Sequence, residues 1–212
     1  MKAQEEYITA GILAGGRSRR LGRDKAFLNW QGRSLIEWSV MRAKGITSNV
    51  YLLAKDRAAY QHLSCPVLPD LYSTSSPLSG ILTVSPFVKQ WLLLLACDIV
   101  LFSDRLLPFL WEQRTPGKAV VVRSKEGLQP LLGFYPVELM EYWERAYQNG
   151  KYKLQPTLQS MPRIEISEFD LPRPQQGGAP FLNINRAADV ENLRNLRTDM
   201  LVNKDSMNQD ST

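Results

Sequence analysis

A short apolar stretch that runs directly into a glycine-rich, basic segment is the feature that most constrains this chain. Residues 7–13 have the composition of a buried β-strand, and glycines follow at positions 15 and 16. Because glycine has no Cβ, the backbone N–H groups of such a turn can approach an anion closely. The segment also carries five basic side chains: Arg17, Arg19, Arg20, Arg23 and Lys25. This order predicts a polyphosphate-binding loop, with a solvated surface loop as the simpler alternative.

The spacing within this segment excludes the commoner phosphate-binding loops. Too many residues separate Gly16 from Gly22 for a Walker loop, and Arg23 stands where that loop has its lysine. The chain contains no G-x-G-x-x-G sequence, so the dinucleotide-binding fingerprint is absent as well. The sequence therefore predicts neither a P-loop nucleoside triphosphatase nor a dinucleotide-binding domain.

The chain has the size and composition of one α/β domain. Its 212 residues are 44% hydrophobic, enough for a packed core. No apolar run reaches the ~20 residues needed to cross a bilayer, and the first six residues do not resemble a secretory signal. Two cysteines and one histidine are too few for a disulfide framework, a multi-cysteine zinc site or a histidine-based triad. A reducing, cytoplasmic location is therefore expected.

The net charge of +5 raises the question of nucleic-acid binding. Much of this excess lies in residues 17–25, where a compact anionic ligand explains it equally well. The chain has no RNP motif, no zinc knuckle and no basic run interleaved with stacking aromatics. A small anionic ligand is therefore expected, with neither nucleic acid nor a membrane as partner.

Alternating apolar and amphipathic segments predict a mostly parallel, doubly wound (Rossmann-like) α/β sheet in a single domain, residues 1–197. Ser34 and Glu37 form a capping box that begins a helix, and Gly45 is placed to end it after Lys44. The all-apolar segment 91–96 suits a central strand covered on both faces. Further strands are expected at 49–54, 65–68, 119–123 and 131–135, helices near 58–63 and 137–147, loops at 69–80 and 171–180, and a tail at 198–212.

Residues 13–25 resemble the signature loop of small-molecule nucleotidyltransferases, L-A-[GA]-G-x-S-x-R-[ML]-G-x-x-K. With its second glycine and the pair Asp24 and Lys25, the segment is most similar to that of the molybdenum cofactor guanylyltransferases. The resemblance implies the nucleotidyltransferase type of α/β fold. It also implies that Arg20 and Lys25 stabilise charge on the leaving pyrophosphate. The nucleotide site would be formed by Leu13, Ala14, Gly15, Gly16 and Lys25, together with Asp70 and Asp98.

Asp98 follows the apolar segment 91–96 and would face the same crevice as the glycine-rich segment. A carboxylate there suits Mg²⁺, which takes hard oxygen ligands beside nucleotide phosphates. An aspartate that caps the next turn is the alternative. The resemblance implies that Asp98 is a catalytic residue and the Mg²⁺ ligand of a C-D-x-P segment, in which Val100 here replaces the proline.

Asp70 also follows an expected strand. Because Pro69 and Asp70 are common turn residues, an Asx turn and a binding role are both open. The family has an aspartate here that contacts the nucleotide, followed by a P-L-x-G-[IM] segment that residues 77–81 reproduce. The resemblance therefore implies that Asp70 binds the nucleotide.

Two later segments resemble the acceptor side of the family's site. Gln129 begins a match to E-P-L, with glutamine in place of the usual acid, although a simple loop-to-strand turn would explain it as well. Residues 181–185 match F-x-N-[IV]-N, which implies that Asn183 and Asn185 complete the metal or phosphate environment. Asn185 could instead cap the last helix, and Arg186 replaces the usual threonine.

The resemblance determines the nucleotide base least. The family tends to have an asparagine near the second strand that holds guanine, whereas this chain has Leu53, Ala54 and Lys55 there. Gly16 favours guanine, because the cytidylyl relatives tend to have L-A-A-G. A smaller residue at this turn leaves room for a purine.

The resemblance implies a Mg²⁺-dependent enzyme that transfers GMP from GTP to the terminal phosphate of molybdopterin and releases pyrophosphate. Other cofactor-biosynthesis proteins could act as partners. Lys151, Lys153 and Arg163 either contact the anionic acceptor or form ordinary surface. A cytidylyl or sugar-phosphate nucleotidyltransferase is the nearest alternative. A catalytically silent nucleotide-binding protein is a further one, although Lys25 and Asp98 are both retained.

Overall fold

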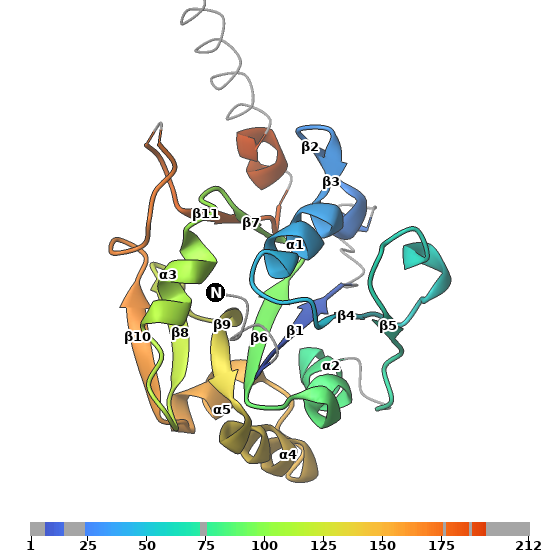
Figure 1. The fold of residues 1–212 in the computed structure, drawn as a ribbon, viewed down its shortest axis with the longest axis vertical. Coiled ribbons are helices and arrows are strands. Elements are labelled where there is room, and N and C mark those ends of the chain that lie inside the picture. Colours follow the sequence, from blue (N-terminus) through green and yellow to red (C-terminus); the bar gives the residue numbers. More distant parts are fainter. Residues whose placement is uncertain (1–6, 15–23, 73–75, 176, 187, 194–212) are drawn as a thin grey trace, which may run out of the picture.

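The structure, a computed structural model, describes residues 7–14, 24–72, 76–175, 177–186 and 188–193. Its centre is a seven-stranded sheet in the order β10-β8-β9-β6-β1-β4-β5 (Figure 1). Within this sheet β9 runs against its neighbours β6 and β8, while the other pairings are parallel. The predicted, mostly parallel sheet is confirmed. Its strands are β1 (Ile8–Leu13), β4 (Val50–Leu53), β5 (Val67–Leu68), β6 (Trp91–Ala96), β8 (Ala119–Ser124), β9 (Gly127–Pro136) and β10 (Arg163–Ser167).

Helices cover both faces of the sheet, as a doubly wound fold requires. Along β6, Leu93 and Leu95 belong to the core on one face, and Leu92 and Leu94 to the core on the other. Because both faces are buried, β6 contains no polar residue. The first face packs against α1 (Leu35–Lys44) and α3 (Leu106–Glu112), and the second against α2 (Pro77–Val84), α4 (Met140–Gln148) and α5 (Leu154–Ser160).

The helix predicted from Ser34 and Glu37 is α1. The Glu37 N–H donates to Ser34 Oγ at 3.4 Å, and the Glu37 carboxylate accepts the Ser34 N–H at 2.7 Å, which completes the capping box. The side-chain and backbone hydrogen bonds from Ser34 lower the pKa of the Glu37 carboxyl. Gly45 is the C-cap, as predicted, although its backbone is right-handed (φ −69°) and does not need glycine.

Two small antiparallel sheets lie near the carboxyl end of β6 (Figure 1). One is the β7–β11 ribbon, formed by β7 (Ile99–Leu101) and β11 (Phe181–Asn183), and the other pairs β2 (Asn29–Trp30) with β3 (Arg33–Ser34). One face of the ribbon belongs to the core under α1 and α3. The other joins a separate small cluster that includes Trp30, Val100 and Ile184.

The register between β8 and β9 shifts at Val121 and Val122, and Gly133 makes this possible. A Cβ at Gly133 would lie 2.5 Å from the Val120 carbonyl oxygen, so only glycine fits. The shift places Gln129 opposite Val122 at the carboxyl edge of the sheet.

The sequence predicts a loop over 69–80, and this prediction is wrong in its last part because α2 begins at Pro77. Ser76 Oγ accepts the Leu78 N–H at 3.2 Å, and Pro77 occupies the first turn, where its missing N–H costs nothing. A serine at the N-cap followed by proline is a helix-start signal, and the loop prediction for this segment did not take it into account.

Short 3-10 helices account for two further differences. The helix expected near 58–63 is only η3 (Ala58–Tyr60), and the one expected at 137–147 is η5 (Val137–Leu139) continued by α4. The structure also contains the short 3-10 helices η2 (Lys25–Phe27) and η4 (Ser85–Phe87). The predicted tail at 198–212, and with it the boundary at residue 197, lies outside the described residues.

Candidate active site

The ends of β1, β4 and β6 form the base of the candidate site. The Cys97 N–H donates to the Leu13 carbonyl at 3.0 Å, and the Ala14 N–H donates to the Leu53 carbonyl at 3.0 Å. These bonds fix Leu13 and Ala14, the predicted start of the nucleotide site, beside the residue that precedes Asp98. The predicted residues Gly15, Gly16 and Arg20 lie outside the described residues.

Three predicted site residues meet at this edge of the sheet. The Lys25 ammonium lies 3.3 Å from Asp98 Oδ2 and 3.1 Å from Asn185 Oδ1. They come from separate segments: Lys25 begins η2, Asp98 follows β6, and Asn185 follows β11. The side chains of Lys25 and Asp98 are 15% and 31% exposed. The pair is open to a ligand, yet sufficiently shielded from water for its charges to interact more strongly than on a free surface.

The β7–β11 ribbon brings Asn185 to Lys25. Asn183 pairs with Ile99 across the ribbon, and the Ile184 N–H donates to the Asp98 carbonyl at 2.8 Å. The strand that ends before Asn185 is therefore bonded directly to the backbone of Asp98.

The helix-cap alternative for Asn185 is not supported, because its side-chain oxygen accepts from Lys25 and from no N–H of the last helix among the described residues. The Asp189 carboxylate accepts the backbone N–H groups of Asn185 and Arg186, each at 2.7 Å. The Asn185 side chain accepts instead from Lys25. The structure thus directs this amide into the candidate site.

Gln129 and Asn183 form a second connection, between the β8–β9 hairpin and β11. Asn183 Nδ2 donates to Gln129 Oε1 at 3.2 Å, and Gln129 Nε2 donates to Ser124 Oγ at 2.8 Å. Asn183 Oδ1 is buried and has no hydrogen-bond partner among the described residues. An unpaired buried oxygen is costly, and a ligand that carries a hydrogen-bond donor would satisfy it.

Asp70 forms the Asx turn that the sequence leaves open. Its Oδ1 accepts the Tyr72 N–H at 3.3 Å. No hydrogen bond given for the described residues joins Asp70 to Lys25 or Asp98, so its nucleotide-binding role stays a prediction.

The segment Pro77–Ile81 lies in the first turns of α2, against the ends of β1 and β4. A Cβ added at Gly80 would lie 3.4 Å from side-chain atoms of both Leu13 and Leu53, so glycine allows the helix to approach these strands. Leu53 and Ala54 are each 5% exposed and apolar. They offer no side-chain hydrogen bond to a base.

The three basic residues considered for the acceptor differ in their surroundings. Arg163 donates to the Glu165 carboxylate at 2.8 Å and to the Gln159 carbonyl at 2.8 Å, so its guanidinium is engaged in the fold. Lys151 and Lys153 are exposed. An acceptor role therefore stays a prediction for these two lysines only.

Tyr60 and Ser124 are residues of this region that the sequence analysis did not identify. The Tyr60 hydroxyl donates to Asp24 Oδ2 at 3.2 Å. Burial, together with the neighbouring Asp24 carboxylate, raises the pKa of the Tyr60 hydroxyl well above its usual value. Asp24 is visible in the signature segment, but nothing in the sequence indicates that its partner lies in η3.

The fold and the site define the class of the protein as an α/β nucleotidyltransferase. The solved structure of molybdopterin-guanine dinucleotide biosynthesis protein A from Archaeoglobus fulgidus has the same fold, with a TM-score of 0.73 at 19% identity. The superposition covers 90% of this chain and 99% of that chain. The family model of the MobA-like NTP transferase domain matches residues 10–164. The chain belongs to this family of nucleotidyltransferases.

Named relatives agree with this assignment. A molybdenum cofactor guanylyltransferase of Pseudomonas syringae pv. syringae is 35% identical over 147 residues, or 66% of this chain and 73% of that protein. A probable molybdenum cofactor guanylyltransferase of Carboxydothermus hydrogenoformans is 30% identical over 190 residues, or 89% of this chain and 95% of that protein. The family resemblance found in residues 13–25 is confirmed. Among the described residues, no helix has the length and hydropathy needed to cross a membrane.

Proposed function

We propose that this protein transfers GMP from GTP to the terminal phosphate of molybdopterin and releases pyrophosphate. The observation that carries the proposal is the Lys25 ammonium between Asp98 and Asn185 at the carboxyl edge of the sheet. A partly exposed carboxylate beside a cation suits a ligand that carries both phosphate and metal. The relatives are named as molybdenum cofactor guanylyltransferases, which supports a guanylyl group as the group transferred.

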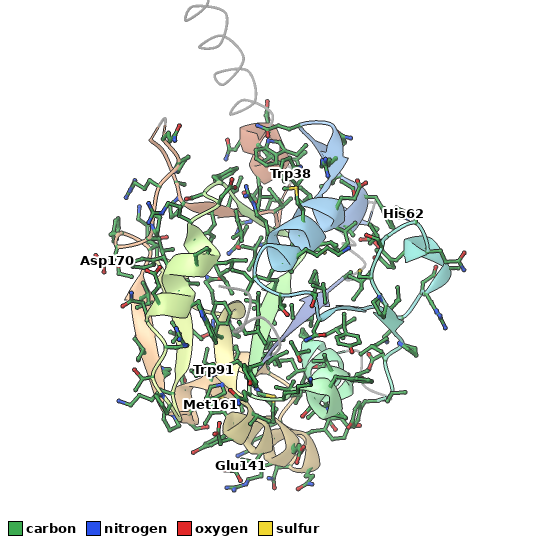
Figure 2. All side chains as sticks on the ribbon, in the orientation of Figure 1. Trp38, His62, Trp91, Glu141, Met161 and Asp170 are labelled. Carbon is green, nitrogen blue, oxygen red and sulfur yellow. The ribbon has the colours of Figure 1, made fainter. Side chains whose placement is uncertain are left out.

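This reaction needs charge neutralisation more than proton transfer. The second pKa of a phosphate monoester is about 6, so the acceptor phosphate is largely ionised at neutral pH. Its oxygen attacks the α-phosphorus of GTP, a new P–O bond forms, and pyrophosphate leaves with the electrons of the broken bond. No general base is needed. His62, the one histidine of the chain (labelled in Figure 2), is exposed, and its ring lies 6.3 Å from the Phe27 ring between centroids.

Lys25 has a defined task in this proposal. Its ammonium would turn toward the nucleotide and neutralise charge that develops on the leaving pyrophosphate. Arg20 would assist as a bidentate donor, and the backbone N–H groups of Gly15 and Gly16 would bind phosphate oxygens. Leu13, Ala14 and Asp70 would complete the nucleotide site.

Asp98 is the residue expected to hold Mg²⁺, and its surroundings fit that ion. The oxygens of Asp98 and Asn185 already flank one cation, the Lys25 ammonium. Mg²⁺ beside a nucleotide usually takes only one or two protein carboxylates, with phosphates and waters as its other ligands. When bound, Mg²⁺ would supply charge neutralisation at the phosphates.

The acceptor is proposed to lie beside Gln129 and Asn183. The unpartnered Asn183 Oδ1 supports an acceptor that carries hydrogen-bond donors, and Lys151 and Lys153 are accessible basic residues. A cytoplasmic location belongs to the same proposal. Delivery of the acceptor by another cofactor-biosynthesis protein belongs to the same proposal.

A cytidylyltransferase is the second candidate, and one observation favours it. The asparagine expected to hold guanine is not found at residues 53–55, and Leu53 and Ala54 are buried and apolar, so these two side chains offer no hydrogen bond to a base. The base preference must therefore be measured directly.

The test compares thermal stability of the wild type and Asp98→Asn with GTP, CTP and ATP, each with and without Mg²⁺. A ligand at about 100 times its Kd stabilises the folded protein by about 2.7 kcal/mol, which gives a clear shift in Tm. We expect a Mg²⁺-dependent shift selective for GTP that Asp98→Asn reduces, followed by pyrophosphate release when molybdopterin is added.

Three results would contradict this proposal. Selectivity for CTP would indicate the cytidylyl relatives. Nucleotide binding without pyrophosphate release would indicate a silent binding protein. If no nucleotide raises the Tm, with or without molybdopterin, residues 13–25 do not form a nucleotide site.

A further inference from the structure

Tyr60 has an unusual position for a residue outside the site. It is 2% exposed, within the core under α1, yet its hydroxyl reaches the residue that precedes Lys25. A buried phenol needs a hydrogen-bond partner, and this one donates to Asp24 Oδ2 at 3.2 Å. Asp24 is the first described residue after the glycine-rich segment.

Tyr60 contacts both ends of η2, the short helix that begins with Lys25. At one end, Asp24 Oδ1 accepts the Ala26 N–H at 3.0 Å and caps η2, while Asp24 Oδ2 accepts from Tyr60. At the other end, the Phe27 ring stacks on the Tyr60 ring, with centroids 5.2 Å apart and planes inclined by 18°. We refer to Asp24, Phe27 and Tyr60 as the η2 clamp.

We propose that Tyr60 is a positioning residue that acts through Asp24 and Phe27 to hold the Lys25 ammonium at Asp98 and Asn185. A lysine ammonium stands on a flexible four-carbon stem, so its placement depends on how firmly its backbone is held. Lys25 lies in a helix of three residues, which has little stability of its own. The clamp attaches that helix to a buried side chain of the main core. The catalytic consequence rests on the function proposed above.

The chain contains a matched control for the ring contact. Phe87 packs against Tyr51 with centroids 4.9 Å apart and planes inclined by 35°, and Phe87 and Phe27 are 44% and 41% exposed. Both rings are half-exposed phenylalanines on a tyrosine, but only Phe27 belongs to η2. Phe87→Ala therefore removes a comparable contact without touching the clamp.

The first measurement is the rate of reductive methylation at each lysine, read by peptide mass spectrometry on the folded full-length protein. Tyr60→Phe keeps the ring and removes the hydroxyl, and Phe27→Ala keeps the hydroxyl and removes the stack. Each should raise the Lys25 rate by at least about threefold, because the ammonium leaves its two oxygen partners more often. Phe87→Ala should leave the Lys25 rate unchanged, and the exposed Lys118 is the internal reference.

The second measurement is the kcat and KM of nucleotidyl transfer. Tyr60→Phe should lower kcat about tenfold with little change in the KM for GTP, since a small displacement of a catalytic group costs rate. Unchanged Lys25 methylation, or unchanged kcat in folded Tyr60→Phe and Phe27→Ala, would overturn the proposal and leave Tyr60 as core packing. A wild type without transferase activity would refute the proposed function, whereas the methylation rates would still test the clamp.

Discussion

The two sides of the candidate site that meet at Lys25 differ in how firmly the fold supports them. On the side of β1, the chain lies between two parallel neighbours, β4 and β6, and the main core continues to Tyr60 under η2. On the side of Asn185, the β7–β11 ribbon has three residue pairs and borders a small separate cluster. Burial in a large core makes the first side part of global folding, whereas a short ribbon can open locally. We therefore expect the ribbon side, although one of its faces packs on the main core, to open locally more readily than the β1 side.

The largest effect is expected when the two side chains that meet at this boundary, Lys25 and Asn185, are each truncated to alanine. Lys25→Ala should lower kcat/KM for GMP transfer by about 10²–10³-fold, as expected when a transition-state charge partner is removed. Asn185→Ala should cost only about tenfold, because Asp98 still holds the ammonium. Steady-state kinetics with Tm as a folding control would measure both. Equal losses would show that the ribbon matters as much as the β1 side.

A pair of core variants tests the difference in stability. Leu93→Ala and Ile184→Ala each truncate a fully buried residue, one in β6 and one beside the ribbon. Leu93→Ala should lower the free energy of unfolding by about 2–5 kcal/mol, and Ile184→Ala by an amount near the lower limit, because a small cluster relaxes more easily. Urea unfolding measures both.

Hydrogen exchange should separate the same two variants. Ile184→Ala should accelerate exchange mainly in β7 and β11, whereas Leu93→Ala should accelerate it across the central sheet. The same exchange pattern in both variants would contradict an independently opening ribbon.

A smaller effect is expected at the link between the ribbon and β9. Gln129→Ala removes the acceptor for Asn183 Nδ2, and should cost about 1 kcal/mol of stability and raise the KM for the acceptor while GTP binding is unchanged. Gln155→Ala is the control, because it removes a similar hydrogen bond to the Leu128 carbonyl. A change in GTP affinity with Gln129→Ala would place Gln129 on the nucleotide side.

The smallest effect concerns pH and the capping box on the β1 side. Ser34→Ala should cost about 1 kcal/mol at neutral pH. Because folding lowers the pKa of Glu37, its stabilising contribution is complete above the ordinary glutamate pKa of about 4.3 and is lost as the pH falls through the lower folded-state value. The difference in unfolding free energy between wild type and Ser34→Ala should therefore shrink below about pH 4. A constant difference from pH 7 to pH 3 would exclude the Glu37 contribution.

Local sequence signals predicted much of the fold. The apolar run of β6, the capping box of α1 and the strands on either side depend on neighbouring residues, so they can be read from the chain. The predictions were wrong where a signal was weak or short. The first part of α2 was predicted to be a loop despite its Ser76 cap, and the helix at η3 was predicted to be longer. The β7–β11 ribbon was not predicted, because its strands are three residues long and pair residues 80 positions apart, as Phe181 and Leu101 do.

For the site, the sequence by itself determined which residue types are present and in which family pattern: Lys25, Asp98, Gln129, Asn183 and Asn185 were all named from motifs. Only the tertiary structure decided that Lys25 lies between Asp98 and Asn185, that the Asn185 amide is directed to Lys25 and not to the last helix, and that Tyr60 reaches Asp24. Such contacts depend on strand order and on the segments that the strands bring together, and these are fixed by packing of the whole core. A motif specifies chemistry through local residues, whereas its geometry comes from contacts between segments far apart in the chain.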